Sequence, residues 1–131
     1  MPVNWTISHV DREVHAIASA ELGADEIQNY LGSVIAEEAM PYSKLFDISQ
    51  VTSVADADRL TEVADTVRLY DKMKLGPIGA LAIVVGDNPQ QAHFAQVFVR
   101  VATAKRPVQI FDDIKKARAW LKHSSSAGRA P

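Results

Sequence analysis

"IGALAIVVGDNP", residues 78–89, is the stretch that decides the fold class. Its first eight residues are apolar or glycine and do not alternate with polar residues, which is typical of a central parallel strand covered on both faces. Gly86 and Asp87 then predict a turn, Asn88 is a suitable N-cap, and Pro89 suits the first position of a helix. A buried strand that runs directly into a helix indicates an α/β protein.

The sequence on both sides of this stretch predicts further strands and helices in alternation. Rough alternation of apolar residues over 5–10 and 14–22 predicts a hairpin, and 42–49 and 105–111 predict two more strands. Apolar residues spaced three and four apart predict helices. Their apolar faces consist of Ile27, Tyr30, Leu31, Val34 and Ile35; Leu60, Val63, Ala64 and Val67; Phe94, Val97, Phe98, Val101 and Ala102; and Ile114, Ala117, Trp120 and Leu121.

The resulting order, β-β-α-β-α-β-α-β-α, predicts an α/β fold with a mixed, mostly parallel five-stranded sheet and four helices. We expect Asp25 or a neighbour to cap the first helix and Pro41 to end it, and Asp112 or Asp113 to cap the last helix. Residues 1–122 are predicted to form one domain. The polar stretch 123–131 is predicted to be a disordered tail.

The composition excludes several classes of protein. The chain has 131 residues, which fits a single domain, and no cysteine, which rules out disulfides, thiolate catalysis and Cys-ligated metals. A formal net charge of −2 gives no general case for binding nucleic acid or an anionic membrane. The sequence shows no signal-peptide pattern and no apolar run long enough for a membrane span. We therefore expect a cytoplasmic protein without a cofactor.

An acidic and hydroxyl-rich stretch, "LFDISQVTSVADADRL" at 45–60, follows the predicted third strand. Ligands of open α/β sheets bind at the carboxyl ends of the strands, so Asp47 with Asp87 could bind a divalent cation or orient a phosphate. Helix capping by Thr52, Ser53 and Asp56 is the simpler interpretation, and we favour it. The candidate residues for a partner or ligand are Asp47, Ser49, Thr52, Ser53, Asp56 and Asp58.

A second candidate loop follows residues 78–85 and contains Asp87, Asn88, Gln91 and His93. It has one glycine and lacks both Gly-x-Gly-x-x-Gly and Gly-Lys-Ser/Thr, which argues against a nucleotide site. His93 lies at the border of an apolar helix face, where packing is more common than acid–base work. The histidines show no zinc-binding spacing, and no Gly-x-Ser-x-Gly motif occurs, so we predict neither a metal site nor a hydrolase.

The second long helix combines apolar and basic residues near its end. Leu60, Tyr70 and Met73 are candidate apolar anchors, because an exposed apolar patch would indicate a partner or dimer surface. Arg68, Lys72 and Lys74 either complement the helix dipole or face an anionic partner.

Three stretches together resemble the SpoIIAA-like family, a branch of the STAS (sulfate transporter and anti-sigma-factor antagonist) fold. They are "YSKLFDISQV", "GALAIVVGDNP" and "RPVQIFDDIKKARAWL", and the resemblance covers residues 3–122. It implies a compact domain that binds proteins, nucleotides or small hydrophobic ligands, in a family whose members are not generally known as enzymes. Regulatory STAS domains carry a phosphorylatable serine in an Asp-Ser-Ser-Gly loop. Residues 55–58, "ADAD", lie near that position, and the serine is absent.

Three functions are consistent with this sequence. The leading hypothesis is a non-catalytic, regulatory domain that binds a protein partner, or a second copy of itself, through residues 49–58 and the helix that follows. The alternative is a lipid or other small hydrophobic ligand held between helices and sheet, with Tyr30 and Phe94 lining the pocket. The third is an enzyme that uses Asp47, Asp87 and His93, which would require these side chains to converge.

Overall fold

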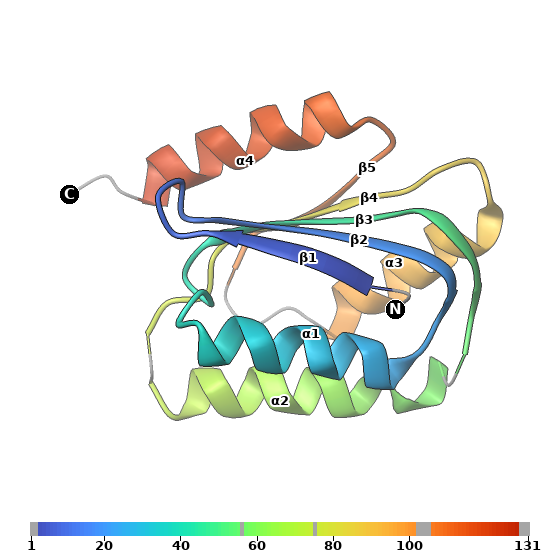
Figure 1. The fold of residues 1–131 in the computed structure, drawn as a ribbon, viewed down its shortest axis with the longest axis horizontal. Helices are drawn as coiled ribbons and strands as arrows, with labels where there is room; N and C mark the ends of the chain where they lie inside the picture. The colour runs from blue at the N-terminus through green and yellow to red at the C-terminus, as the bar shows by residue number, and fades with distance from the viewer. Residues whose placement is uncertain (1–2, 56, 75, 102–105, 129–131) are drawn as a thin grey trace.

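The structure is a computed structural model that describes residues 3–55, 57–74, 76–101 and 106–128. Its elements follow the predicted order β-β-α-β-α-β-α-β-α, which confirms the predicted α/β class (Figure 1). They are β1 (Val3–Ser8), β2 (Glu13–Leu22), α1 (Ala24–Ala36), β3 (Ser43–Val54), the 3-10 turn η1 (Ala57–Arg59), α2 (Leu60–Lys72), β4 (Leu81–Val84), α3 (Pro89–Val101), β5 (Val108–Phe111) and α4 (Ile114–Gly128).

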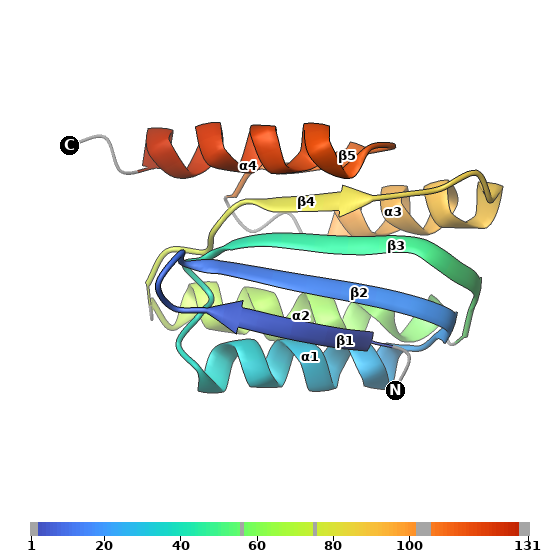
Figure 2. The same ribbon diagram turned by 45° about the horizontal axis from the view of Figure 1, so that its top comes forward.

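The five strands lie in the sheet in the same order as in the chain, β1-β2-β3-β4-β5. The β1–β2 hairpin is antiparallel, and β2, β3, β4 and β5 pair in parallel. Connections between parallel strands are right-handed, so helices that join successive neighbours must lie on one face of the sheet. Figures 1 and 2 show α1, α2 and α3 on one face and α4 alone on the other.

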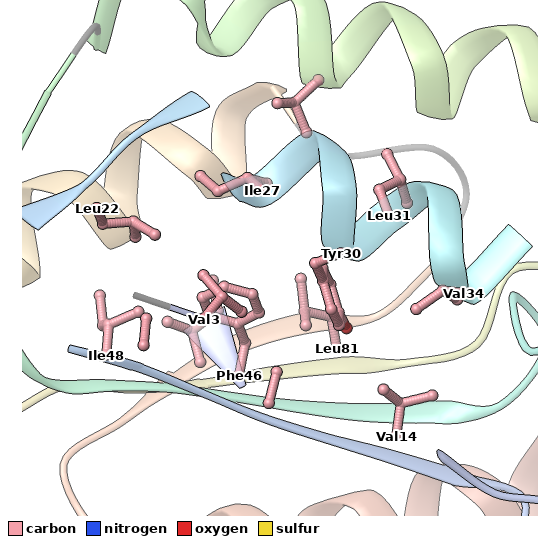
Figure 3. Close-up of a cluster of buried hydrophobic side chains, with 14 of the residues drawn as sticks. Val3, Val14, Leu22, Ile27, Tyr30, Leu31, Val34, Phe46, Ile48 and Leu81 are labelled. Carbon is pink, nitrogen blue, oxygen red and sulfur yellow. The ribbon is translucent and has the colours of Figure 1, made fainter. Parts of the chain in front are cut away.

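The core has two layers because both faces of the central strands are covered. Phe46 and Ile48 of β3 belong to the larger cluster, which α1, α2 and α3 cover. Ile27, Tyr30, Leu31 and Val34 of α1 belong to this layer, and Figure 3 shows Tyr30 directed toward the strands. Leu45, the neighbour of Phe46, packs in the second cluster with Ala117 and Leu121 of α4. The alternation along β3 thus fills both layers.

The helix starts that depend on Asn88 and Asp113 form as predicted. Asn88 Oδ1 accepts a hydrogen bond from Gln90 N at 2.9 Å, and α3 begins at Pro89. Asp113 Oδ1 accepts one from Lys115 N at 2.7 Å, one residue before α4. In both places a short polar side chain satisfies an amide that the first turn leaves free.

The predicted ends of α1 are wrong. Gly23 is the N-cap, and Asp25 lies inside the helix. The helix ends at Ala36, well before Pro41, because Glu38 takes a left-handed conformation with φ 58°. Ala39 N donates to Val34 O at 2.9 Å and Glu38 N donates to Ile35 O at 3.0 Å, the pattern of a Schellman motif. Glu38 occupies the left-handed position that glycine usually takes at the end of a helix, so no glycine indicates this helix end in the sequence.

Some element lengths also differ from the prediction. β3 continues to Val54 because β2 pairs with it as far as Leu22, well past the end of β4. α4 extends to Gly128, into the stretch 123–131 for which a disordered tail was expected, and that expectation remains a prediction. None of the helices in the described ranges is long and apolar enough to cross a membrane.

Candidate functional site

Asp47 is the last residue of β3 that pairs with β4, and it is 9% exposed. Its Oδ1 accepts hydrogen bonds from Ser49 N at 2.9 Å and from Ser49 Oγ at 2.6 Å. The β2–β3 register shifts here, with Ile48 and Ser49 opposite the single residue Ala18. Such a bulge leaves an amide without a partner on the neighbouring strand. Asp47 therefore supports the local strand geometry.

Gln91 joins three segments at the same edge of the sheet and is 4% exposed. Its Nε2 donates to Val51 O at 2.7 Å and to Ser49 O at 3.1 Å, and its Oε1 accepts from Gly86 N at 2.6 Å. One side-chain amide thereby links α3, the end of β3 and the turn after β4. A Cβ atom at Gly86 would lie 3.0 Å from Gln91 Oε1 and 3.1 Å from Ser49 O. The close approach of these two atoms to the Gly86 backbone therefore favours glycine at this position.

The remaining candidates on this edge are dispersed over the surface. Thr52, Asp58, Asp87 and His93 are exposed, and Ser53 is half-buried. No hydrogen bond connects any two of the proposed catalytic residues in the described part of the chain. In the part of the chain that the structure describes, no three His, Asp or Glu side chains are grouped so that they could hold a metal ion. The enzyme hypothesis therefore gains no support from the arrangement of these side chains.

Thr52 and Ser53 do not cap α2, contrary to the favoured interpretation. Both lie inside β3, where Ser53 is paired in register with Glu21. The N-cap position of α2 is Arg59, whose side chain makes no cap bond within the described part of the chain. Asp58 lies in the preceding 3-10 turn, and Asp56 lies outside the described residues.

Arg59 makes a contact that the sequence patterns do not reveal. Its Nη2 donates to Asp25 Oδ1 at 2.8 Å and to Glu62 Oε2 at 3.0 Å. Hydrogen bonds to Glu62 and Asp25 raise the pKa of Arg59. The Glu62 contact has ordinary helical spacing, but the Asp25 contact depends on α1 and α2 lying side by side, as they do in Figure 1.

The three predicted apolar anchors have different environments. Leu60 is 2% exposed and belongs to the core, so it cannot contact a partner. Tyr70 is half-buried against the same core, whereas Met73 is 58% exposed. Leu69, which is not among the predicted anchors, is 57% exposed. We call Leu69, Tyr70 and Met73 the α2 patch. The helical spacing of Leu60, Val63 and Val67 already places Leu69 outside the buried face.

The aromatic residues proposed to line a hydrophobic pocket pack against other rings. Tyr30 makes edge contacts with Trp5 and Phe46, at centroid distances of 5.7 Å and 5.3 Å. Phe94 stacks on Phe98 at 5.9 Å. These contacts are those of a packed core. Binding of a hydrophobic ligand between helices and sheet stays a prediction.

Residues 35–125 match the model of a family described as a domain of unknown function, DUF7793. The chain belongs to this DUF7793 family. The matched residues run from the end of α1 into α4, and they include the acidic stretch at 49–58 and the α2 patch. No curated protein matches the chain.

The DUF7793 chain is also similar to a solved structure of an uncharacterised protein of the DUF3478 family, with a SpoIIAA-like fold, from Shewanella loihica PV-4. The two share 18% sequence identity, the match covers 91% of each chain, and the TM-score is 0.55. This likeness confirms the SpoIIAA-like fold that the sequence resemblance predicted.

Proposed function

We propose that this domain works without catalysis, by protein–protein interaction through the exposed side of α2. The supporting observation is that Leu69 and Met73, one helical turn apart, are both more than half exposed. Burial of a Leu or Met side chain contributes about 1.5–3 kcal/mol, so leaving two adjacent ones in water forgoes a sizeable stabilisation. A binding surface accounts for that arrangement.

The charges around the α2 patch favour a second copy of the chain as partner. The first half of the helix carries Glu62 and Asp65, which are paired with Arg59 and Arg68, and the end carries the exposed Lys72 and Lys74 beside Asp71. Two α2 helices that meet antiparallel across a two-fold axis would place each acidic half near the partner's basic half. Their apolar patches would meet at the centre, with charged residues at the rim.

Asp58 is exposed in η1, at the start of α2, near the position where regulatory STAS domains carry their serine. A carboxylate adds its negative charge permanently, whereas a serine does so only when phosphorylated. We therefore propose an interaction that does not require phosphorylation of this loop.

Sedimentation velocity over a wide concentration range tests the proposal. A single pair of helices buries less surface than a standard interface, so we expect a weak dimer that is visible only at high concentration. The double variant Leu69→Glu/Met73→Glu should remain monomeric at every concentration. Val10→Glu is the matched control, because Val10 is 94% exposed in the turn between β1 and β2 and lies outside the patch.

A strictly monomeric wild type would exclude the second copy and leave a different protein as partner. A photo-crosslinking amino acid at position 69, and for comparison at position 10, then tests that case in cells that express the chain. A crosslinked protein specific to position 69 supports the interaction surface. Absence of both a dimer and a specific crosslink would overturn the proposed function.

A further inference from the structure

Three polar side chains gather at the amino-terminal ends of the parallel strands, away from the edge already described. Lys44 is the second residue of β3, Arg106 lies two residues before β5, and Tyr30 belongs to α1. All three lie on or beside the face of the sheet that α1, α2 and α3 cover.

The strand register sets the spacing of this cluster. Lys44 pairs with Leu81 of β4, and Leu81 pairs with Val108 of β5. Leu81 N also donates to Pro107 O at 2.9 Å, which fixes the residue after Arg106 beside β4. Figure 3 shows the Tyr30 hydroxyl directed from α1 toward the sheet beside Leu81. Neighbouring strands are about 4.8 Å apart, so the three side chains arise within a few strand spacings of one another.

The donors of this cluster are buried and incompletely paired. Lys44 is 3% exposed, and its Nζ donates to the backbone carbonyls of Met40 and Tyr42, the latter at 2.8 Å. Arg106 Nε and Tyr30 Oη are buried and have no hydrogen-bond partner among the residues that the structure describes. Buried donors in native proteins nearly always have an acceptor, so two such atoms beside a buried ammonium indicate a missing acceptor.

The charges point to the same kind of acceptor. Within the described ranges, neither Lys44 nor Arg106 forms an ion pair with a carboxylate. Burial, together with the Arg106 charge, lowers the pKa of Lys44 well below its usual range. Burial also lowers the pKa of Arg106 to about 10. A buried ammonium that is disfavoured by a neighbouring guanidinium, and the guanidinium itself, would both be stabilised by one anion between them.

We propose that Tyr30, Lys44 and Arg106 bind an oxyanion, a carboxylate or phosphate group, at the amino-terminal end of the parallel strands. The guanidinium and the phenol each donate a hydrogen bond to it, and the ammonium supplies a second positive charge. The group can come from a small free anion or from the head of an amphiphile whose chain lies along the apolar layer. The chemistry at the three donors is the same in both cases.

Titrations followed by two-dimensional NMR test this site in the full chain. Sodium phosphate, acetate and decanoate are added at constant ionic strength, and the backbone amides of Lys44 and Leu81 report binding. We expect saturable shifts. Tyr30→Phe keeps the ring and removes one donor, and it should weaken binding about tenfold, as should Arg106→Gln. Arg68→Gln is the control, because Arg68 lies on the exposed side of α2 in an ion pair with Asp65.

Each outcome has a defined meaning. Tighter binding of decanoate than of acetate assigns the site to the head group of an amphiphile. Equal binding of these two, or binding of phosphate alone, assigns it to a small free anion. Shifts that never saturate for any of the three anions overturn the proposal, as do equal affinities in wild type and Tyr30→Phe. Tyr30→Phe removes a single oxygen, so the test does not depend on Arg106→Gln remaining folded.

Discussion

Single buried polar side chains determine the local geometry of this molecule. Gln91 binds main-chain groups of β3 and of the turn after β4, and Lys44 binds two carbonyls of the loop that leads into its own strand. Sequence patterns place Gln91 in a ligand loop and do not single out Lys44. A pattern indicates the residue type and its approximate element, but the Gln91 amide bonds Ser49 and Val51, about 40 residues earlier in the chain, and no local pattern reveals that contact.

Gln91→Ala should destabilise the fold by about 2–4 kcal/mol, because it leaves Gly86 N without its acceptor and two carbonyls without their donor. Urea denaturation measures the change. Gln90→Ala is the control on the same helix, since Gln90 is exposed, and it should change stability by less than about 0.5 kcal/mol. Similar losses in both variants would contradict the linking role of Gln91.

Lys44→Met should change how stability depends on pH. The folded-state pKa of Lys44 lies below its unfolded value of about 10.4, so the unfolded chain binds more protons between the two values. Stability from this group is fully present above the unfolded pKa and is lost as the pH falls toward the folded one. Relative to Lys44→Met, the wild type should therefore gain stability as the pH rises from 7 to 9. Parallel pH profiles from thermal unfolding would refute this.

Elements and their types are largely predictable from the sequence, whereas several ends and contacts are not. Asn88–Pro89 and Asp113 predict the helix starts correctly because each cap acts within a few residues. The end of α1 escapes prediction because Glu38 adopts a backbone conformation that favours glycine. Thr52 and Ser53 resemble helix caps because the sequence does not reveal how far β2 pairs along β3.

Replacing two glycines by alanine should change the stability of the fold in opposite directions. A Cβ atom at Gly79 would collide with Tyr42 O and lie 2.5 Å from Pro41 O, both backbone atoms. Gly79→Ala should therefore cost about 2–4 kcal/mol. Gly32 lies on the exposed side of α1, where an added methyl group would meet no described atom within 4 Å, so Gly32→Ala should stabilise the protein by about 0.5–1 kcal/mol. Thermal unfolding distinguishes the two, and equal effects would show that the β3–β4 approach is not tight.

At the scale of the whole molecule, stability is expected to concentrate in the centre of the sheet. β3 is covered on both faces and is paired along nearly its whole length, whereas β1 and β5 are the edge strands. The buried, unalternating residues at 78–85 correctly predict that β4 is buried and lies between two parallel neighbours. The surface proposed to bind a partner is less predictable, because Leu69 looks like any other helical leucine until the core is known.

Amide hydrogen exchange followed by mass spectrometry should therefore be slowest in β3 and in residues 13–17 of β2, which pair with strands on both sides. Exchange in β5 should be faster, because its four residues have a neighbour on one side only. Exchange in β5 as slow as in β3 would show that the sheet opens only by global unfolding.

The sheet order has a consequence for synthesis on the ribosome. Every strand pairs with the strand made immediately before it, so no strand must wait for a neighbour that has not yet been translated. The hairpin can close first, and each later strand then adds to an edge that already exists. Besides the permanent edge at β1, a growing chain of this kind exposes only the edge of its newest strand, which limits the surface available for misassembly.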